Sequence, residues 1–157
     1  MTALIILVVA IAATVAVGLI LQSRAGKVRA TAPAATAAVD DERATQLAAA
    51  GVTATGRPIV LHFSADWCGP CAAVRRVVGQ VLARFEADPD GTPAATEVEV
   101  DIDEHPALAK TLGVLSLPTT FILDGALTER FRISGVPSAP DLETSLAPLL
   151  ETGRPNS

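Results

Sequence analysis

Alternating and periodic apolar positions define short elements in the second half of the chain. Residues 59–64, IVLHFS, form an apolar run that predicts a buried strand. Across residues 71–85, apolar side chains recur every three or four positions with arginines between them, which predicts an amphipathic helix. Residues 96–103, TEVEVDID, alternate as a strand does. A further helix is expected from Pro106 to Gly113, since proline suits the first helical turn and glycine the end.

The C-terminal part of the pattern predicts a hairpin and a last helix. Residues 119–125 and 129–135 are two strand-like runs around an Asp-Gly pair, which favours a tight turn. Residues 138–151 predict a helix that is capped by Ser138 and carries Pro140 in its first turn. The order strand, helix, strand, helix, hairpin, helix predicts an α/β fold: a mixed central β-sheet flanked by helices, with a right-handed first crossover.

The N-terminus follows a different pattern. Residues 1–23 contain no charged side chain, and residues 4–21 are almost wholly Ile, Leu, Val and Ala. An apolar run of about 18 residues is long enough to cross a bilayer core. This predicts a single N-terminal transmembrane helix over residues 1–23. The alternative is a cleaved secretory signal; the lack of a basic region before the apolar run, and the length of that run, favour a retained anchor.

The segment after this helix carries positive charge and then small residues. Arg24, Lys27 and Arg29 follow the apolar run directly, and because such residues tend to stay on the cytoplasmic side, they predict a cytoplasmic C-terminal domain, with an extracytoplasmic domain as the alternative. Residues 24–50 are expected to form this basic collar and an Ala/Thr/Pro linker, which ends in further linker or in a short helix. Residues 51–153 are then the folded domain.

The length and the charge of the C-terminal part limit the functions that the chain can have. A domain of roughly 100 residues can bury a core of its own. From residue 40 onwards the chain has all 17 acidic and 9 of the 12 basic side chains, a net charge of −8. This balance opposes nucleic-acid binding, which needs a basic surface. Arginine far outnumbers lysine and alanine is abundant, a composition typical of high-GC bacterial genomes.

Two cysteines in a C-x-x-C pair supply the candidate chemistry. Cys68 and Cys71 are the only cysteines, and Trp67, the only tryptophan, precedes them. A purely structural disulfide would close too short a loop to stabilise the fold much. A zinc site needs four ligands, and the sequence has no second pair to complete it. A redox dithiol needs only the residues present. Cys68 lies at a strand-to-helix turn, where a helix dipole stabilises a thiolate, so it is the expected nucleophile and Cys71 the resolving thiol.

These motifs resemble the thioredoxin family. The stretches FSADWCGPCAAVRRV, VEVDIDEHPALAKTLGVLSLPTTFIL and FRISGV carry the resemblance, which covers about 100 residues, roughly 51–150. It implies a thioredoxin fold and reduction of protein disulfides through the Cys68–Cys71 pair. It implies no other cofactor and no metal. Its expected partners are protein disulfide substrates and a reductase or dithiol donor, with the lipid bilayer added by the N-terminal helix.

The resemblance also implies a substrate-binding set around the dithiol. Its members are Trp67, Gly69, Pro70, Leu117, Pro118 and Gly135. By this resemblance Trp67 covers the dithiol, the Gly-Pro pair between the cysteines favours the reducing direction, and Pro118 is a cis proline facing the sulfurs. Leu117 would offer its backbone to an extended substrate, and Gly135 would keep a flat edge beside it.

Two positions depart from the family pattern. His62 stands where thioredoxins usually have a buried aspartate, and Glu99 where they have a lysine partner. That aspartate is thought to accept the proton of the resolving cysteine. His62 is a third candidate catalytic residue, since imidazole titrates near neutral pH, and Glu99 would orient or charge its ring. The alternative is a structural histidine in a strand, hydrogen-bonded to backbone.

Three functions remain open from the sequence. The first is a membrane-tethered thiol–disulfide oxidoreductase that reduces protein disulfides. The second is an extracytoplasmic oxidant, isomerase or cytochrome-maturation reductase. The third is a binding module, without turnover, that recruits a membrane partner or holds a metal through Cys68, Cys71 and His62. A separate acidic group is interpreted as a solvated loop rather than a metal site: Asp101, Asp103 and Glu104.

Overall fold

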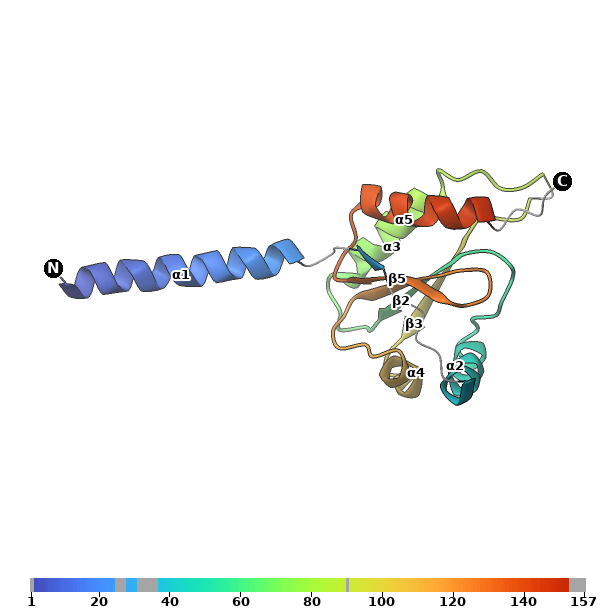
Figure 1. Ribbon diagram of the computed structural model, residues 1–157, viewed down its shortest axis with the longest axis horizontal. Coiled ribbons are helices and arrows are strands. Elements are labelled where there is room, and N and C mark those ends of the chain that lie inside the picture. The colour runs from blue at the N-terminus through green and yellow to red at the C-terminus, as the bar shows by residue number, and fades with distance from the viewer. Residues whose placement is uncertain (1, 25–27, 31–36, 90, 153–157) are drawn as a thin grey trace.

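The computed structural model describes residues 2–24, 28–30, 37–89 and 91–152. From residue 59 onwards the predicted order of elements is confirmed (Figure 1). Two helices and a short strand between them precede the first strand of this order. In chain order the elements are α1 (Thr2–Arg24), β1 (Val28–Ala30), α2 (Ala37–Ala49), β2 (Ile59–Ser64), α3 (Cys71–Leu82), β3 (Thr96–Asp101), α4 (Pro106–Thr111), β4 (Thr119–Leu123), β5 (Glu129–Ser134) and α5 (Ala139–Thr152).

The five strands form one mixed sheet in the order β1-β5-β4-β2-β3. β2 pairs parallel with β3, and the β2–β4, β4–β5 and β5–β1 pairs are antiparallel. All six residues of β2 are buried, because strands lie on both sides of it and helices cover both faces. That is why the sequence of β2 is a continuous apolar run, whereas the edge strand β3 alternates.

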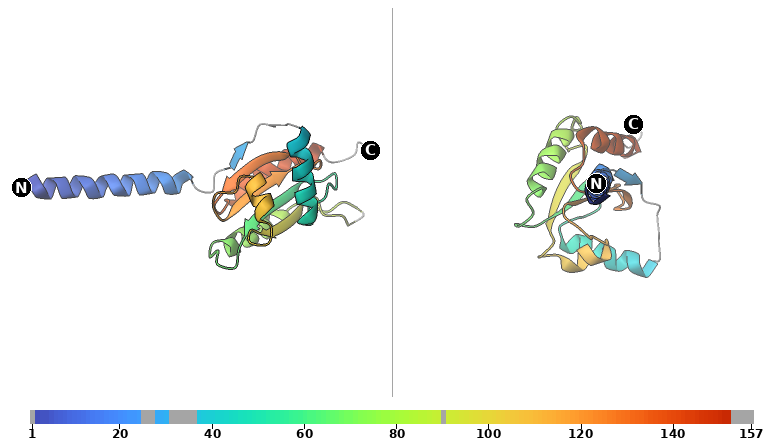
Figure 2. Two further views of the ribbon diagram at one scale, coloured as in Figure 1. Left: turned by 90° about the horizontal axis from the view of Figure 1, so that it is seen from below. Right: turned by 90° about the vertical axis from the view of Figure 1, so that its left-hand side faces the viewer.

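Helices cover the two faces of the sheet in pairs. Seen along α1, α3 and α5 lie on one face and α2 and α4 on the other (Figure 2). Alternate residues of β2 supply the two cores: Val60 packs with the buried valines of α3 and leucines of α5, whereas Leu61 and Phe63 pack with Leu47 and Leu108 from α2 and α4. This period of two decides which face each side chain near the cysteines occupies.

The N-terminal helix is present, as α1, and projects away from the domain (Figure 1). Within the part of the chain that the structure describes, no helix combines the length and the apolarity that crossing a membrane requires. The predicted N-terminal helix is therefore observed over Thr2–Arg24, and its membrane span is not supported.

The segment predicted as collar and linker contains a strand that the sequence did not indicate and a helix that it left as an alternative. Val28 to Ala30 form β1, which pairs with β5 and covers a strand edge that would otherwise be open. α2 begins at Ala37, and Leu47 on it is buried in the core beside Val52. The short helix, left as an alternative, is thus observed, and the packed core begins before residue 51. Residues 31–36, in the predicted linker, lie outside the described residues.

The hairpin forms, but its turn differs from the two-residue turn expected. Asp124 Oδ1 accepts hydrogen bonds from the backbone N–H groups of Ala126 and Thr128, at 3.0 and 2.9 Å, so the loop is longer. Gly125 has another role. A Cβ added there would lie 2.3 Å from the backbone of Gly56, so glycine allows the two loops to approach.

The starts of α5 and α4 agree with the sequence prediction, and the end of α3 differs from it. Ser138 Oγ accepts the backbone N–H of Asp141 at 3.2 Å, which confirms Ser138 as the cap of α5. His105 precedes α4, which starts at Pro106 as predicted. α3 ends at Leu82 rather than at residue 85, because the chain tightens there into turns bonded between residues three apart.

Candidate active site at the start of helix α3

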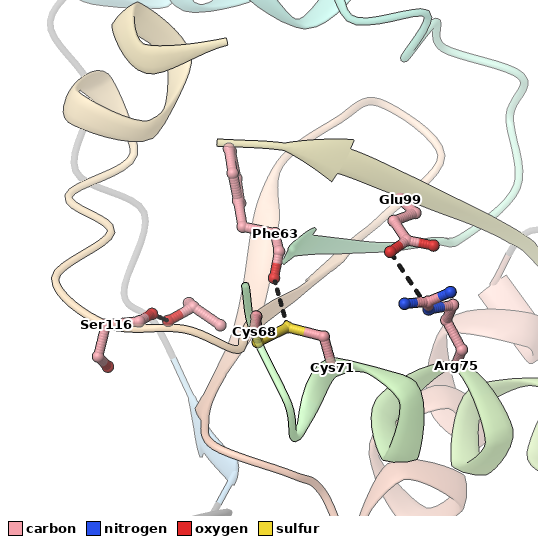
Figure 3. The surroundings of a disulfide bond; sticks show 7 residues. Phe63, Cys68, Cys71, Arg75, Glu99 and Ser116 are labelled. Carbon is pink, nitrogen blue, oxygen red and sulfur yellow. Dashed lines mark hydrogen bonds and ion pairs between the residues drawn. A yellow bond between two sulfur atoms is a disulfide. The ribbon is translucent and has the colours of Figure 1, made fainter. Parts of the chain in front are cut away.

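The turn between β2 and α3 brings the two cysteines together. Cys68 and Cys71 form a disulfide, with their Cα atoms 5.5 Å apart (Figure 3). The backbone N–H of Cys71 donates to the carbonyl of Cys68 at 3.2 Å, which closes the turn. Gly69 and Pro70 lie exposed between them, and Pro70 directly precedes the first residue of α3. The predicted dithiol is therefore geometrically able to form a disulfide.

The two sulfurs occupy different environments. Cys68 is half-buried just before α3, at the positive end of the helix dipole. Cys71 is 0% exposed, and its Sγ lies 3.9 Å from the carbonyl oxygen of Phe63 (Figure 3). A substrate can reach the first sulfur and not the second. This is the exposure that an attacking Cys68 and a resolving Cys71 require.

The loop before β4 borders the disulfide. Ser116 on this loop lies on the opposite side of the disulfide from Arg75 (Figure 3). The Leu117–Pro118 peptide bond is cis, as the resemblance implied. The carbonyl of Pro118 accepts the backbone N–H of Gly135 at 2.8 Å, and Gly135 has φ +89°, a conformation that favours glycine. Three predicted substrate-binding residues thus lie in two adjacent, hydrogen-bonded segments.

Trp67 is held by a residue that the sequence did not connect with it. The indole is 70% exposed, and its Nε1 donates to Asp103 Oδ2 at 3.1 Å. Asp103 is fixed in turn, since its backbone N–H donates to Asp101 Oδ1 at 2.7 Å. Two of the acidic residues that were interpreted as a solvated loop therefore position the tryptophan next to Cys68.

An open groove of about 460 Å³ adjoins the disulfide turn. Its walls include Trp67, Ile102, Asp103, Pro106, Val114 and Leu115. Leu115 is 96% exposed. Among the described residues outside α1, Trp67 and Leu115 are the exposed large apolar side chains, and both line this groove. An apolar surface therefore accompanies the accessible sulfur.

His62 is a buried residue of β2, the strand that precedes the disulfide turn. It is 0% exposed and shares with Val60 the face of β2 that α3 covers. Its Nε2 lies 2.9 Å from Glu97 Oε1 on β3. The expectation that Glu99 would orient the ring is wrong. Glu99 is the register partner of His62, but its carboxylate forms an ion pair with Arg75 of α3 at 3.3 Å (Figure 3).

The alternation of β3 explains why the sequence missed Glu97. Val98 and Val100 pack on the α2/α4 side, so Glu97 and Glu99 both project toward the α3 side, where His62 lies. The sequence therefore offered two carboxylates on the correct face. In the structure Arg75 pairs with Glu99 and thereby leaves Glu97 as the partner of His62. The alternation of a strand does not predict which of the two carboxylates Arg75 binds.

The folded domain is similar in sequence to known proteins over most of its length. The family model described as Thioredoxin matches residues 42–147. A thioredoxin of Mycolicibacterium smegmatis is 34% identical over 80 residues, which cover 50% of this chain and 68% of that protein. Thioredoxin 1 of Nostoc sp. is 32% identical over 94 residues, covering 60% of this chain and 78% of that one.

Solved structures agree with this assignment. A mutant thioredoxin from Halobacterium salinarum is similar with a TM-score of 0.53 and 26% identity, covering 65% of this chain and 82% of that one. Thioredoxin-2 of the malaria parasite has a TM-score of 0.51 at 26% identity, covering 59% of this chain and 82% of that one. The chain belongs to the thioredoxin family, and it is a thiol–disulfide oxidoreductase whose redox pair is Cys68 and Cys71.

Proposed function

We propose that this oxidoreductase works as a reductase of protein disulfides. The Cys68 thiolate attacks a substrate disulfide, forms a mixed disulfide and displaces one substrate thiolate. The Cys71 thiolate then attacks Sγ of Cys68 and displaces the second. The substrate gains two electrons, and the protein ends in the disulfide form that the structure contains. The single observation that carries this order of events is the accessible Cys68 beside the buried Cys71.

The direction of the reaction rests on the residues between the cysteines. Gly69 and Pro70 give the same Cys-Gly-Pro-Cys pair as in thioredoxin, which has a reduction potential of about −270 mV. At such a potential the dithiol donates electrons to disulfides whose reduction potential is higher than its own. A reductase or another dithiol donor then returns two electrons to the Cys68–Cys71 disulfide and completes the cycle.

Substrate binding is assigned to the surface around Cys68. An extended substrate segment would lie against Trp67 and pair with the backbone at Leu117, next to the cis Pro118 and the left-handed Gly135. The 2.8 Å hydrogen bond between the last two residues keeps their segments together. This arrangement favours protein disulfides over small disulfides, because it adds backbone and apolar contacts to the sulfur exchange.

His62 is assigned to the second step of the reaction, in which the buried Cys71 attacks Cys68. The Cys71 thiol must lose its proton before it can attack, and it is enclosed at 0% exposure. His62 lies on the α3-covered face of β2 and carries a nitrogen able to accept that proton. We assign it the task that a buried aspartate has in the family pattern.

A further part of the proposal is that α1 holds the domain at a lipid bilayer, on its cytoplasmic side. The support is a set of apolar side chains that are each more than half exposed: Ile5, Ile6, Leu7, Val8, Val9, Ile11, Val15 and Val17. Exposed apolar surface of this kind marks membrane or protein contacts. The positive residues at the end of α1 and just after it, Arg24, Lys27 and Arg29, favour the cytoplasmic side.

Serine substitutions test the redox assignment. We expect Cys68→Ser to abolish reduction of insulin disulfides, because no other accessible thiol exists in the chain. Cys71→Ser should instead accumulate a mixed disulfide with the substrate, visible by mass spectrometry and released by dithiothreitol. Full turnover by the Cys68→Ser protein would contradict the proposal.

Labelling in intact cells tests the proposed location. A membrane-impermeant maleimide should leave Cys68 unlabelled until the cells are permeabilised, and the chain should sediment with membranes. Strong labelling of intact cells would place the dithiol outside the cytoplasm. It would favour the alternative of an extracytoplasmic oxidant, isomerase or cytochrome-maturation reductase, which the reduction potential of the purified chain would then distinguish.

A further inference from the structure

We propose that Glu97 completes a thiol–imidazole–carboxylate relay with Cys71 and His62. In this relay Glu97 is a positioning residue: it fixes which nitrogen of His62 is free to accept the Cys71 proton. The inference deepens the proposed reductase function and rests on it.

The contact with Glu97 sets the tautomer of His62. An ionised carboxylate only accepts hydrogen bonds, so the 2.9 Å contact between Glu97 Oε1 and His62 Nε2 requires the imidazole proton to be on Nε2. Nδ1 then carries a lone pair. Nδ1 is buried and has no hydrogen-bond partner among the described residues. Glu97 thereby leaves the ring with one occupied nitrogen and one nitrogen available as a base.

The path of α3 places this base near the thiol. α3 links two parallel strands, so it runs back along β2 from its first residue, Cys71. The Cys71 sulfur contacts the carbonyl of Phe63, the residue directly after His62. His62 is on the face of β2 that α3 covers, one position further from the helix start. Cys71 and His62 are thus both buried on the side of β2 that α3 covers. The relay requires His62 Nδ1 to lie within hydrogen-bond reach of the Cys71 sulfur, or one water away from it.

Glu97 also offsets the charge that the transfer creates. A proton on Nδ1 turns His62 into a buried cation, which is costly unless a partner offsets it. Glu97 supplies that negative charge. Its side chain is 29% exposed, so water can still solvate the carboxylate. The other groups on this side are less suited, because Glu99 is engaged by Arg75 and the position opposite His62 on β4 is Thr120, which does not titrate.

Protons and electrons balance in the resolving step. The S–H bond of Cys71 breaks and its proton binds His62 Nδ1. The Cys71 thiolate attacks Sγ of Cys68, the new disulfide forms, and the bond between Cys68 and the substrate sulfur breaks. The electron pair leaves with the substrate thiolate. His62 then returns its proton to that thiolate or to water.

A single-turnover experiment separates this step from the attack. The reduced full-length chain is mixed with an equimolar amount of Ellman's reagent, an aromatic disulfide. The first nitrothiobenzoate is released when Cys68 attacks, and the second when Cys71 resolves the mixed disulfide. We expect Glu97→Ala to slow the second release about tenfold or more, and to leave the first unchanged. Glu97→Gln, which keeps an acceptor but not the charge, should fall between it and the parent protein.

Glu99→Ala is the matched control, because it removes the neighbouring carboxylate on the same face of β3 and leaves the His62 contact intact. It should change neither release. Nitrogen NMR of His62 gives a second readout: the parent protein should carry its proton on Nε2, and Glu97→Ala should populate both tautomers. Thermal melting checks that each variant is folded.

Three results would overturn the relay. The first is an unchanged second release in the Glu97→Ala protein, and the second is an equal slowing by Glu99→Ala. The third is the absence of any first release from the parent protein, which would remove the proposed reductase function itself. In that case the NMR readout shows separately whether Glu97 still fixes the tautomer.

Discussion

The two sides of the Cys68–Cys71 disulfide differ in their exposure to solvent and in the groups that surround each sulfur. On the outer side, Cys68 is accessible, Trp67 is 70% exposed and an apolar groove opens to solvent. On the inner side, Cys71 and His62 are both 0% exposed, and their polar contacts are a backbone carbonyl and one carboxylate, Glu97. A single disulfide bond therefore joins an exposed apolar surface, the proposed recognition surface, to an enclosed polar site, the proposed site of proton transfer.

The two environments suit the two cysteines to different steps of the reaction. A thiolate on the outer side is stabilised by the helix start and by water, so it needs no dedicated base. A thiol on the inner side is shielded from bulk solvent, so its ionisation depends on a buried acceptor. Substitutions on the outer side should therefore change attack and binding, whereas those on the inner side should change resolution.

Differential alkylation is expected to give the largest effect. In the reduced chain, iodoacetamide should modify Cys68 at least about a hundredfold faster than Cys71, because thiolate character and access both favour the first sulfur. Peptide mapping by mass spectrometry after short exposure measures the two rates. Denatured chain, in which both thiols are accessible, is the control and should show nearly equal rates. Comparable rates in the folded chain would remove the distinction between the two sides.

Replacing His62, the proposed base, should give the next largest effect. We expect His62→Leu to slow resolution by Cys71 about tenfold to a hundredfold, since it removes the proton acceptor, while attack by Cys68 keeps its rate. The free energy of unfolding should stay within about 1 kcal/mol of the parent value, because the lost hydrogen bond and the relieved burial of Nδ1 offset each other. The two releases from Ellman's reagent and urea unfolding measure both quantities.

Thr120→Val is the control for that variant. Thr120 lies opposite His62 on β4, and its buried Oγ1 has no hydrogen-bond partner among the described residues. Valine of similar shape removes this hydroxyl, so the fold should gain about 1 kcal/mol of stability while resolution keeps its rate. If Thr120→Val slowed resolution as much as His62→Leu does, the rate loss would reflect packing rather than proton transfer.

The outer side could be predicted from the sequence because its signals are local. The C-x-x-C spacing and the strand-to-helix transition lie within about a dozen consecutive residues, and the periodicities of 59–64 and 71–85 fix their environment. The cis bond before Pro118 came from the family resemblance and is confirmed. The burial of His62 agrees with the buried strand predicted over residues 59–64, and the burial of Cys71 agrees with its expected role as the resolving thiol.

The partners across the sheet could not be predicted in the same way. His62 and Glu97 are 35 residues apart, and Trp67 and Asp103 are 36 apart. Strand alternation places a side chain on a face but does not select between two equivalent carboxylates on that face. The pairing of β1 with β5 is also non-local, since three residues give no strand signal and only the open edge of β5 accounts for it.

The Trp67–Asp103 contact gives the smallest effect expected. An exposed hydrogen bond contributes little, about 0.5–1 kcal/mol, so Asp103→Ala should raise the KM for a protein disulfide about threefold. Its attack on Ellman's reagent should not change, because a small disulfide does not depend on the indole. Trp67 is the only tryptophan, so fluorescence anisotropy reports directly on the freed ring and should fall.

Asp66→Ala is the matched control for charge, because it removes an exposed carboxylate beside Trp67 in the chain and keeps the indole hydrogen bond. If both variants raise KM equally, the effect is electrostatic and Asp103 has no positioning role. If Asp103→Ala alone lowers the anisotropy and raises KM, an ordered tryptophan is part of recognition. The two sides would then use the same kind of contact. On the outer side Asp103 orients the indole of Trp67, and on the inner side Glu97 orients the imidazole of His62.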